Sequence, residues 1–148
     1  MKIKITTLVD QHFLQVKQGF NQDLFLKLNP PFPPVKLLRF DGSKEGDKVV
    51  LELNFIFFKQ TWESLITEDH LDDEQFFFVD KGIKLPFFLG AWEHRHILKN
   101  VNGKTAIVDD ISFKTPSILF DYLMYPALFF QFLYRKPVYK KFFRKKAT

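Results

Sequence analysis

"AWEHRHILKNVNGKTAIVDDISF" (residues 91–113) predicts a β-hairpin, and this hairpin decides the fold. Two runs of alternating apolar and polar residues flank Asn102-Gly103, a dipeptide that favours the tight turns joining antiparallel strands. With this dipeptide at the tip, one face of the hairpin is mostly apolar and the other mostly charged, as in a half-buried sheet. The pairs expected on the apolar face are Trp92 with Phe113, His94 with Ile111, His96 with Asp109, and Leu98 with Ile107.

The remaining sequence predicts an α+β fold. Residues 2–9 alternate as a short strand, and the helical spacing of residues 10–29 is broken near Gly19, which indicates two short helices. Further strands are expected at 35–40, 48–57, 61–67 and 74–80. The apolar C-terminal segment predicts a long helix, with Pro126 in its first turn and a kink at Pro137. The expected architecture is a curved antiparallel sheet of about six to seven strands wrapped on this helix.

Three polar residues are expected on the buried face of the hairpin, and three interpretations of them remain open. His94, His96 and Asp109 could supply ligands to a metal ion. A His96–Asp109 pair could act as general base and orienting carboxylate. The same groups could form a satisfied buried pair, or orient a ligand in an apolar cavity. We expect the hairpin to hold no metal, because Asp109 is already committed to His96 as a hydrogen-bond partner.

Length and composition favour one cytoplasmic domain. The chain has 148 residues, which suits a single domain over residues 1–148. It has no cysteine, which excludes disulfides and thiolate metal sites, and its N-terminus lacks the apolar run of an ordinary secretory signal. No cofactor is expected. Phenylalanine is abundant, at 20 residues, so the chain either packs an aromatic core or lines an apolar cavity.

The net charge of +5 comes from the C-terminal end. A basic tail is expected over residues 135–148, solvated and dispensable for folding. Its charges are too local for a nucleic-acid footprint, so no nucleic acid is expected. Weak attraction of the tail to an anionic membrane surface stays open. The basic residues of the tail are Arg135, Lys136, Lys140, Lys141, Arg144, Lys145 and Lys146.

The segment 116–134 is apolar, but Asp121, Gln131 and two prolines argue against a transmembrane span.

Several short motifs resemble the START-like superfamily, also called SRPBCC, whose members share the helix-grip fold. The closest resemblance is to small single-domain bacterial members of the polyketide cyclase/dehydrase-like, ligand-binding type. Leu85 stands where these proteins usually have glycine, and Phe113 stands where tyrosine is usual, so a tyrosine hydroxyl is absent here. The motifs are FFVD (77–80), LPFF (85–88), WEHRH (92–96), DISFKTP (110–116, with Asp109 just before it) and FLYR (132–135).

The resemblance implies a deep cavity between the sheet and the C-terminal helix, and a hydrophobic or amphipathic ligand that is lipid-like or aromatic. It does not supply a reaction, because the superfamily contains carriers, receptors and cyclases. The first expectation is a binding or carrier protein. The alternative is a cyclase, dehydratase or hydrolase in which His96 and Asp109 are catalytic. The candidate ligand-binding residues are Leu53, Phe55, Trp92, His94, His96, Asp109, Phe113, Phe129, Phe130 and Leu133.

Overall fold

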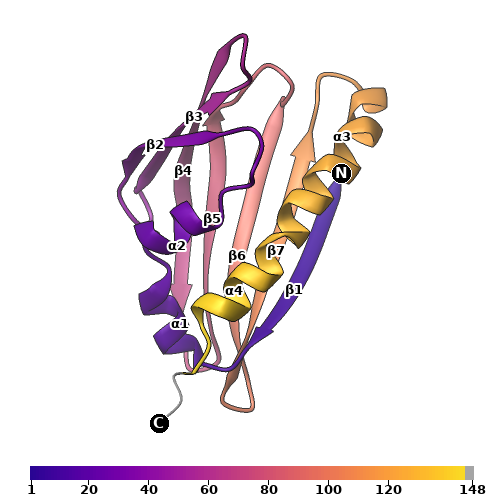
Figure 1. Cartoon of the computed structure of the whole chain (residues 1–148). Helices are drawn as coiled ribbons and strands as arrows, with labels where there is room; N and C mark the ends of the chain where they lie inside the picture. Colours follow the sequence, from indigo (N-terminus) through magenta and orange to yellow (C-terminus); the bar gives the residue numbers. More distant parts are fainter. Residues whose placement is uncertain (146–148) are drawn as a thin grey trace.

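The hairpin at residues 91–114 lies inside a seven-stranded antiparallel sheet (Figure 1). The computed structural model describes residues 1–145 of the chain. The strand order is β1-β7-β6-β5-β4-β3-β2, so each strand from β2 to β7 pairs with its neighbour in sequence, and β1 completes the edge beside β7. The strands are β1 (Lys2–Val9), β2 (Val35–Phe40), β3 (Lys48–Asn54), β4 (Lys59–Leu71), β5 (Gln75–Lys84), β6 (Ala91–Val101) and β7 (Lys104–Lys114).

The predicted register of the β6–β7 hairpin is confirmed. Trp92 pairs with Phe113, His94 with Ile111, and His96 with Asp109. The turn residues Asn102 and Gly103 have φ values of 52° and 81°, and such a pair of positive values is what a tight two-residue hairpin turn requires. The local turn chemistry therefore fixes which side chains of this hairpin share a face.

The strand predicted at 48–57 is shorter than expected. β3 ends at Asn54, whose side-chain oxygen accepts a hydrogen bond from the backbone of Ile56 at 3.0 Å. Ile56 has a positive φ of 75°, which is incompatible with an extended strand, so the alternation of apolar residues stops here. Phe57, which a strand continued to residue 57 would place on the same face as Leu53, is 93% exposed.

The two short helices are confirmed, whereas the predicted start of the long helix is wrong. They are α1 (Phe13–Gly19) and α2 (Gln22–Lys27). The long helix α3 (Ile118–Leu133) begins well before Pro126, because the Ser117 hydroxyl accepts a hydrogen bond from the backbone of Phe120 and caps the first turn. Pro126 therefore lies inside α3, on its exposed side.

The C-terminal segment is a helix that packs into the core, so the prediction that it is a solvated tail is wrong. After a break at Tyr134, α4 (Arg135–Phe142) begins, with Pro137 in its first turn, where the missing backbone donor costs nothing. Tyr139 and Phe143 are buried, whereas Lys140 and Lys141 remain exposed. Lys146, the last basic residue of the predicted tail, lies outside the described residues.

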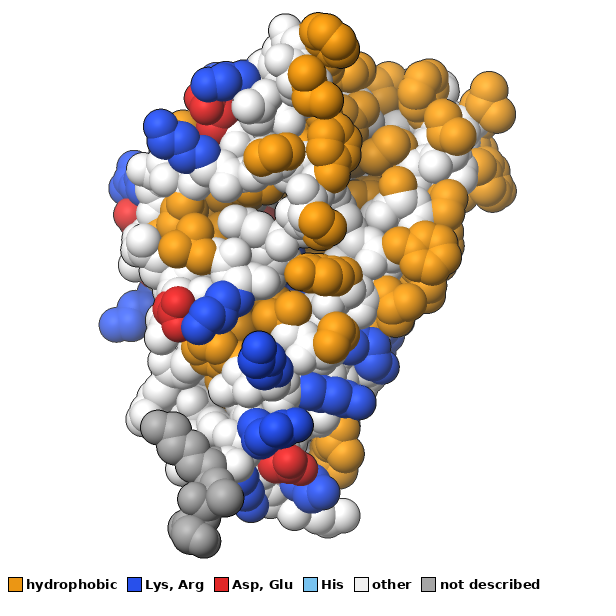
Figure 2. All heavy atoms as spheres, in the orientation of Figure 1, with side chains coloured by type: hydrophobic (Ala, Val, Ile, Leu, Met, Phe, Trp, Pro, Cys, Tyr) orange, Lys and Arg blue, Asp and Glu red, His pale blue; other side chains and the backbone are white. Residues whose placement is uncertain are grey.

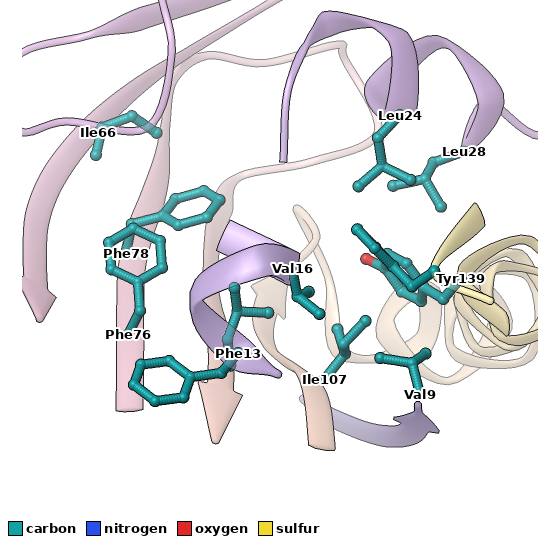
Figure 3. Packing of buried hydrophobic residues seen from close by; sticks show 12 residues of the cluster. Val9, Phe13, Val16, Leu24, Leu28, Ile66, Phe76, Phe78, Ile107 and Tyr139 are labelled. Atoms are coloured by element: carbon teal, nitrogen blue, oxygen red, sulfur yellow. The ribbon is translucent and has the colours of Figure 1, made fainter. Parts of the chain in front are cut away.

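Two hydrophobic clusters cover opposite ends of the concave face of the sheet. One joins α1, α2 and α4 to the strands, and Figure 3 shows Tyr139 of α4 turned towards Val9, Val16 and Ile107. The other joins α3 to β1, β6 and β7, and contains Trp92 and Phe132. Among the described helices, none has the length and hydropathy needed to cross a membrane.

Candidate functional site

A cavity of about 410 Å³ lies between the sheet and the helices. Its walls come from the concave faces of β3 to β6, from α2 and the proline-rich segment that follows it, and from one side of α3. This volume falls within the usual range for small-molecule sites. The apolar wall is formed by Leu24, Phe25, Leu28, Phe32, Val49, Leu51, Leu53, Phe55, Trp62, Ile66, Phe78, Phe88, Trp92, Met124, Leu128 and Phe132, among others.

Polar side chains gather at one part of the cavity wall. The β5–β6 register places Asp80 opposite His94, and Phe78 opposite His96. Because these residues face the same side of the sheet, one ligand atom each from Asp80, His94 and His96 can be found within 4.8 Å of the others. Ser64 of β4 and Arg135 of α4 also line the cavity.

The structure corrects the predicted partner of Asp109. His94 Nε2 lies 2.9 Å from Asp109 Oδ1 and makes the hydrogen bond, whereas His96 Nδ1 lies 3.9 Å from the same oxygen and makes none. His96 is the Cα partner of Asp109 across the strands, but its ring stacks on Phe78 with centroids 4.3 Å apart. Diagonal neighbours in an antiparallel pair are within reach of long side chains, so His94 reaches Asp109.

Asp109 is a buried carboxylate with three partners. Besides His94, the Tyr139 hydroxyl lies 3.4 Å from Oδ1 and Arg135 Nη1 lies 3.7 Å from it. Burial raises the pKa of Asp109, and the charge of Arg135 opposes this shift. Burial, helped by the charge of Arg135, lowers the pKa of His94 well below its usual value. His94 is therefore neutral and donates its Nε2–H to Asp109, which fixes the orientation of the ring.

Asp80 is an acidic residue of the cavity wall whose pKa is raised. Its Oδ1 is shielded from solvent and finds no hydrogen-bond partner among residues 1–145. Burial raises the pKa of Asp80 to about 6, and the nearby Ser64 hydroxyl and Arg135 charge limit the rise. Ser64 itself accepts a hydrogen bond from Trp62 Nε1 at 3.1 Å. An unpaired buried carboxylate oxygen is costly, and Asp109 Oδ2, outside the cavity wall, is a second such oxygen among the described residues.

His96 presents a second unsatisfied group. Its Nδ1 is buried and unpaired within the described chain, and its ring lies 3.5 Å from that of His94, measured between centroids. Burial, followed by the proximity of His94, lowers the pKa of His96 well below its usual value. The imidazole is therefore neutral at physiological pH and can donate or accept a hydrogen bond.

The same residues include a set that could coordinate a divalent cation. Two neutral imidazoles and one carboxylate, from His94, His96 and Asp80, match the donors that zinc and iron accept. Asp109 behind His94 would act as the outer partner that orients a ligating histidine. The positive charge of Arg135 opposes a cation here. The set differs from the sequence prediction because Asp80 replaces Asp109.

Half of the predicted ligand-binding residues line the cavity, and the other half do not. Leu53, Phe55, Trp92, His94 and His96 form part of its wall. Asp109 and Phe113 are buried in the packing around it instead. Phe129, Phe130 and Leu133 are turned away from it, because the side of α3 that faces the cavity carries Met124, Leu128, Gln131 and Phe132.

Sequence reasoning missed the residues that bring charge to the cavity. Asp80 follows Phe76 and Phe78 at a spacing of two, so the alternation alone places it on their face of β5. To predict that Asp80 lies opposite His94, the β5–β6 register must be known. The sequence between these two strands has no tight-turn motif that would fix this register. Arg135 was assigned to the solvated tail, although its guanidinium carbon lies 4.2 Å from the centre of the Phe132 ring, a cation–π contact.

No family model and no curated protein matches the sequence. Solved structures with the same fold are nevertheless numerous. An aromatase/cyclase from a Streptomyces species is 14% identical, with a TM-score of 0.70 over 94% of this chain and 90% of that chain. A protein from Chromobacterium violaceum is 13% identical, with a TM-score of 0.71 over 99% of both chains.

A third similar structure, the norcoclaurine synthase from Thalictrum flavum, was solved in complex with dopamine and hydroxybenzaldehyde. It is 11% identical, with a TM-score of 0.68 over all of this chain and 89% of that chain. At such identities the likeness concerns the fold. A curved seven-stranded antiparallel sheet, two short helices after β1 and a long C-terminal helix complete the match. The chain therefore has the helix-grip fold, which it shares with these solved structures.

Proposed function

We propose that the protein binds one hydrophobic or amphipathic small molecule in the cavity between the sheet and α3. The observation that carries the proposal is the combination of a largely apolar cavity of about 410 Å³ with unpaired polar atoms on Asp80 and His96. Apolar walls supply affinity, and a few fixed polar groups orient the ligand.

The polar groups indicate what the ligand carries. Asp80 Oδ1 is an acceptor without a donor, so a hydroxyl or amine of the ligand would satisfy it. Arg135 beside it is suited to a carbonyl or carboxylate oxygen. The preferred ligand is therefore an aromatic or lipid-like molecule with an oxygen-bearing polar end. Aromatic polyketides and fatty acids with a hydroxyl group are examples of such molecules.

The two tryptophans provide a direct test. Both residues, Trp62 and Trp92, line the cavity, and their rings lie 4.9 Å apart in an edge-to-face contact. Titration with a naphthol, which has an apolar body and a hydroxyl, should change the tryptophan fluorescence and saturate at one equivalent. Asp80→Ala should weaken binding of the naphthol more than binding of naphthalene, because only the naphthol has a donor for Asp80. Linear quenching without saturation would contradict the proposal.

A second candidate function is catalysis of a cyclase, dehydratase or hydrolase type. The observation that favours it is a carboxyl with a pKa of about 6 beside a neutral imidazole at the cavity wall. Two of the similar structures are an aromatase/cyclase and a synthase. Asp80 and His96 would be the acid and base, because Asp109 lies behind His94. In this proposal Asp80 takes the place of Asp109 as the carboxyl partner of His96 in catalysis.

The two candidates are separated by the fate of the bound molecule. A ligand recovered from the protein should be returned to wild type and to Asp80→Asn, incubated, and identified by mass spectrometry. An unchanged ligand in both samples supports a carrier. A product formed by wild type and not by Asp80→Asn supports an enzyme, since the amide keeps the shape of the side chain but cannot exchange a proton.

A further inference from the structure

The exposed side of α3 is apolar along its length. Ile118 and Leu119 are 75% and 76% exposed, and Phe130 near the other end is 65% exposed. Between residues 118 and 134 the sequence has a single charged residue, Asp121, and this side chain is buried because it accepts a hydrogen bond from the backbone of Thr115 at 2.6 Å. A surface helix normally exposes charged residues to water, so the apolar exposed side of α3 indicates a surface that binds a partner or a membrane.

A second group of exposed apolar side chains belongs to the β3–β4 and β5–β6 loops. Figure 1 shows these loops at the end of the sheet where α3 begins. Ile56 and Phe57 are exposed in the β3–β4 connection, and Phe87 is exposed in the β5–β6 connection. The ring of Phe58 joins the two loops, 5.8 Å from that of Phe87 between centroids. Phe55, stacked on Phe58 at 5.2 Å, lines the cavity. The loop residues therefore form a rim of the cavity.

Basic side chains adjoin the apolar side of α3. Figure 2 shows hydrophobic side chains covering the upper part of this face of the molecule and Lys and Arg side chains gathered below them. Lys140, Lys141, Arg144 and Lys145 are exposed on α4 and just after it. From residue 122 to the end, the sequence contains no acidic residue. An apolar surface bordered by positive charge is the arrangement of elements that bind the interface of anionic membranes.

We propose that this apolar surface, made of the exposed side of α3 and of the loop residues 56–58 and 87, docks onto an anionic phospholipid bilayer. The aromatic loop residues enter the headgroup region, α3 lies along the interface, and the basic residues of α4 meet the lipid phosphates. Docking would place the rim of the cavity against the bilayer, from which a hydrophobic ligand could enter. The surface itself is independent of the proposed ligand.

The charges favour a membrane over a second copy of the chain. A second copy carries the same lysines and arginines, and it therefore offers them no opposite charge along this surface. The apolar residues also lie on a helix and on two projecting loops, and lipid can adapt to such an uneven surface. Anionic headgroups satisfy the basic residues and the acyl region satisfies the rings at the same time.

Vesicle flotation with the full chain tests the proposal. Vesicles of phosphatidylcholine alone are compared with vesicles that also contain phosphatidylglycerol. We expect binding to the anionic vesicles that weakens with added salt. Phe57→Ser combined with Leu119→Ser should reduce binding roughly tenfold or more. Lys140→Glu combined with Lys141→Glu should reduce it by a similar factor, on anionic vesicles only. Leu71→Ser, at an exposed apolar residue of the opposite end of β4, is the matched control and should bind as wild type does.

Two results would overturn the proposal. One is equal flotation of wild type and of the Phe57/Leu119 variant, which would mean that these residues do not contact lipid. The other is a wild-type protein that does not float and forms a dimer in light scattering, with Leu119→Ser converting it to a monomer. The second result would assign the surface to a second copy. All substituted residues are exposed, and circular dichroism of each variant checks that it folds.

Discussion

At the residue scale, the buried His94–Asp109 hydrogen bond holds the polar part of the cavity wall in place. His94→Ala leaves the carboxylate without its closest partner, and we expect a loss of about 1–3 kcal/mol in the free energy of unfolding. The double variant His94→Ala/Asp109→Asn should lose less stability than the sum of the two single variants, because the two side chains share one hydrogen bond. The measurement is urea unfolding of the wild type, the two single variants and the double variant.

His96→Ala is the matched control for this cycle. His96 lies beside His94 and is the direct Cα partner of Asp109 in the strand register, but it makes no hydrogen bond to the carboxylate. The coupling free energy between His96→Ala and Asp109→Asn should be smaller than that between His94→Ala and Asp109→Asn. A larger coupling for His96 would contradict the arrangement of the two rings described above.

Asp80 predicts how stability changes with pH. Its pKa is raised from 3.8 to about 6 in the folded chain, so the folded state binds more protons than the unfolded state between these values. The free energy of unfolding should therefore fall as pH rises from about 4 to about 7, by roughly 1–3 kcal/mol. Asp80→Asn cannot ionise and should remove this part of the decline. Urea unfolding of both proteins at a series of pH values measures the difference, and parallel curves would show that Asp80 is solvated.

At the element scale, α4 is part of the core although its composition resembles a solvated tail. Tyr139 and Phe143 lie four residues apart and are buried on one side of the helix, while the lysines between them face water. Phe143 also packs against Gly19 at the end of α1, where an added Cβ would come within 2.5 Å of the ring. The helix therefore ties the C-terminal end of the chain to α1.

Truncation of the chain after Lys136 should destabilise it more than Leu133→Ala does. The truncation removes two fully buried rings, and large aromatic losses from a core cost about 3–5 kcal/mol each. Leu133 is partly exposed, so its truncation to alanine costs less. Thermal unfolding of the two variants gives the ranking. If the truncated chain were the more stable of the two, α4 would contribute nothing to the core.

The elements differ in how far the sequence predicts them, and the reasons are physical. The β6–β7 register follows from the local requirement of Asn102-Gly103 for positive φ, so the sequence suffices. The side of α3 that faces the cavity is set by packing, because apolar residues surround this helix and their spacing does not select one side. The choice of His94 over His96 depends on side-chain packing against Phe78, which no strand alternation predicts.

At the scale of the whole molecule, the cavity exists because the sheet curves away from α3 while α2 and the proline-rich segment close the space in front of it (Figure 1). The two hydrophobic clusters anchor α4 and α3 at either end, so the region between them can stay open without loss of the fold. Binding would therefore depend on the shape of this space as a whole more than on any one side chain.

Native mass spectrometry of the protein, titrated with an aromatic alcohol, tests the central claim of a ligand-binding cavity most directly. Leu53→Trp should fill part of the cavity from β3, whereas Lys36→Trp, on exposed β2, adds the same ring outside and serves as control. We predict a one-to-one complex for wild type and Lys36→Trp, and its loss in Leu53→Trp with the fold retained. Equal complex formation by all three proteins, or by none, would contradict the claim that this cavity binds the ligand.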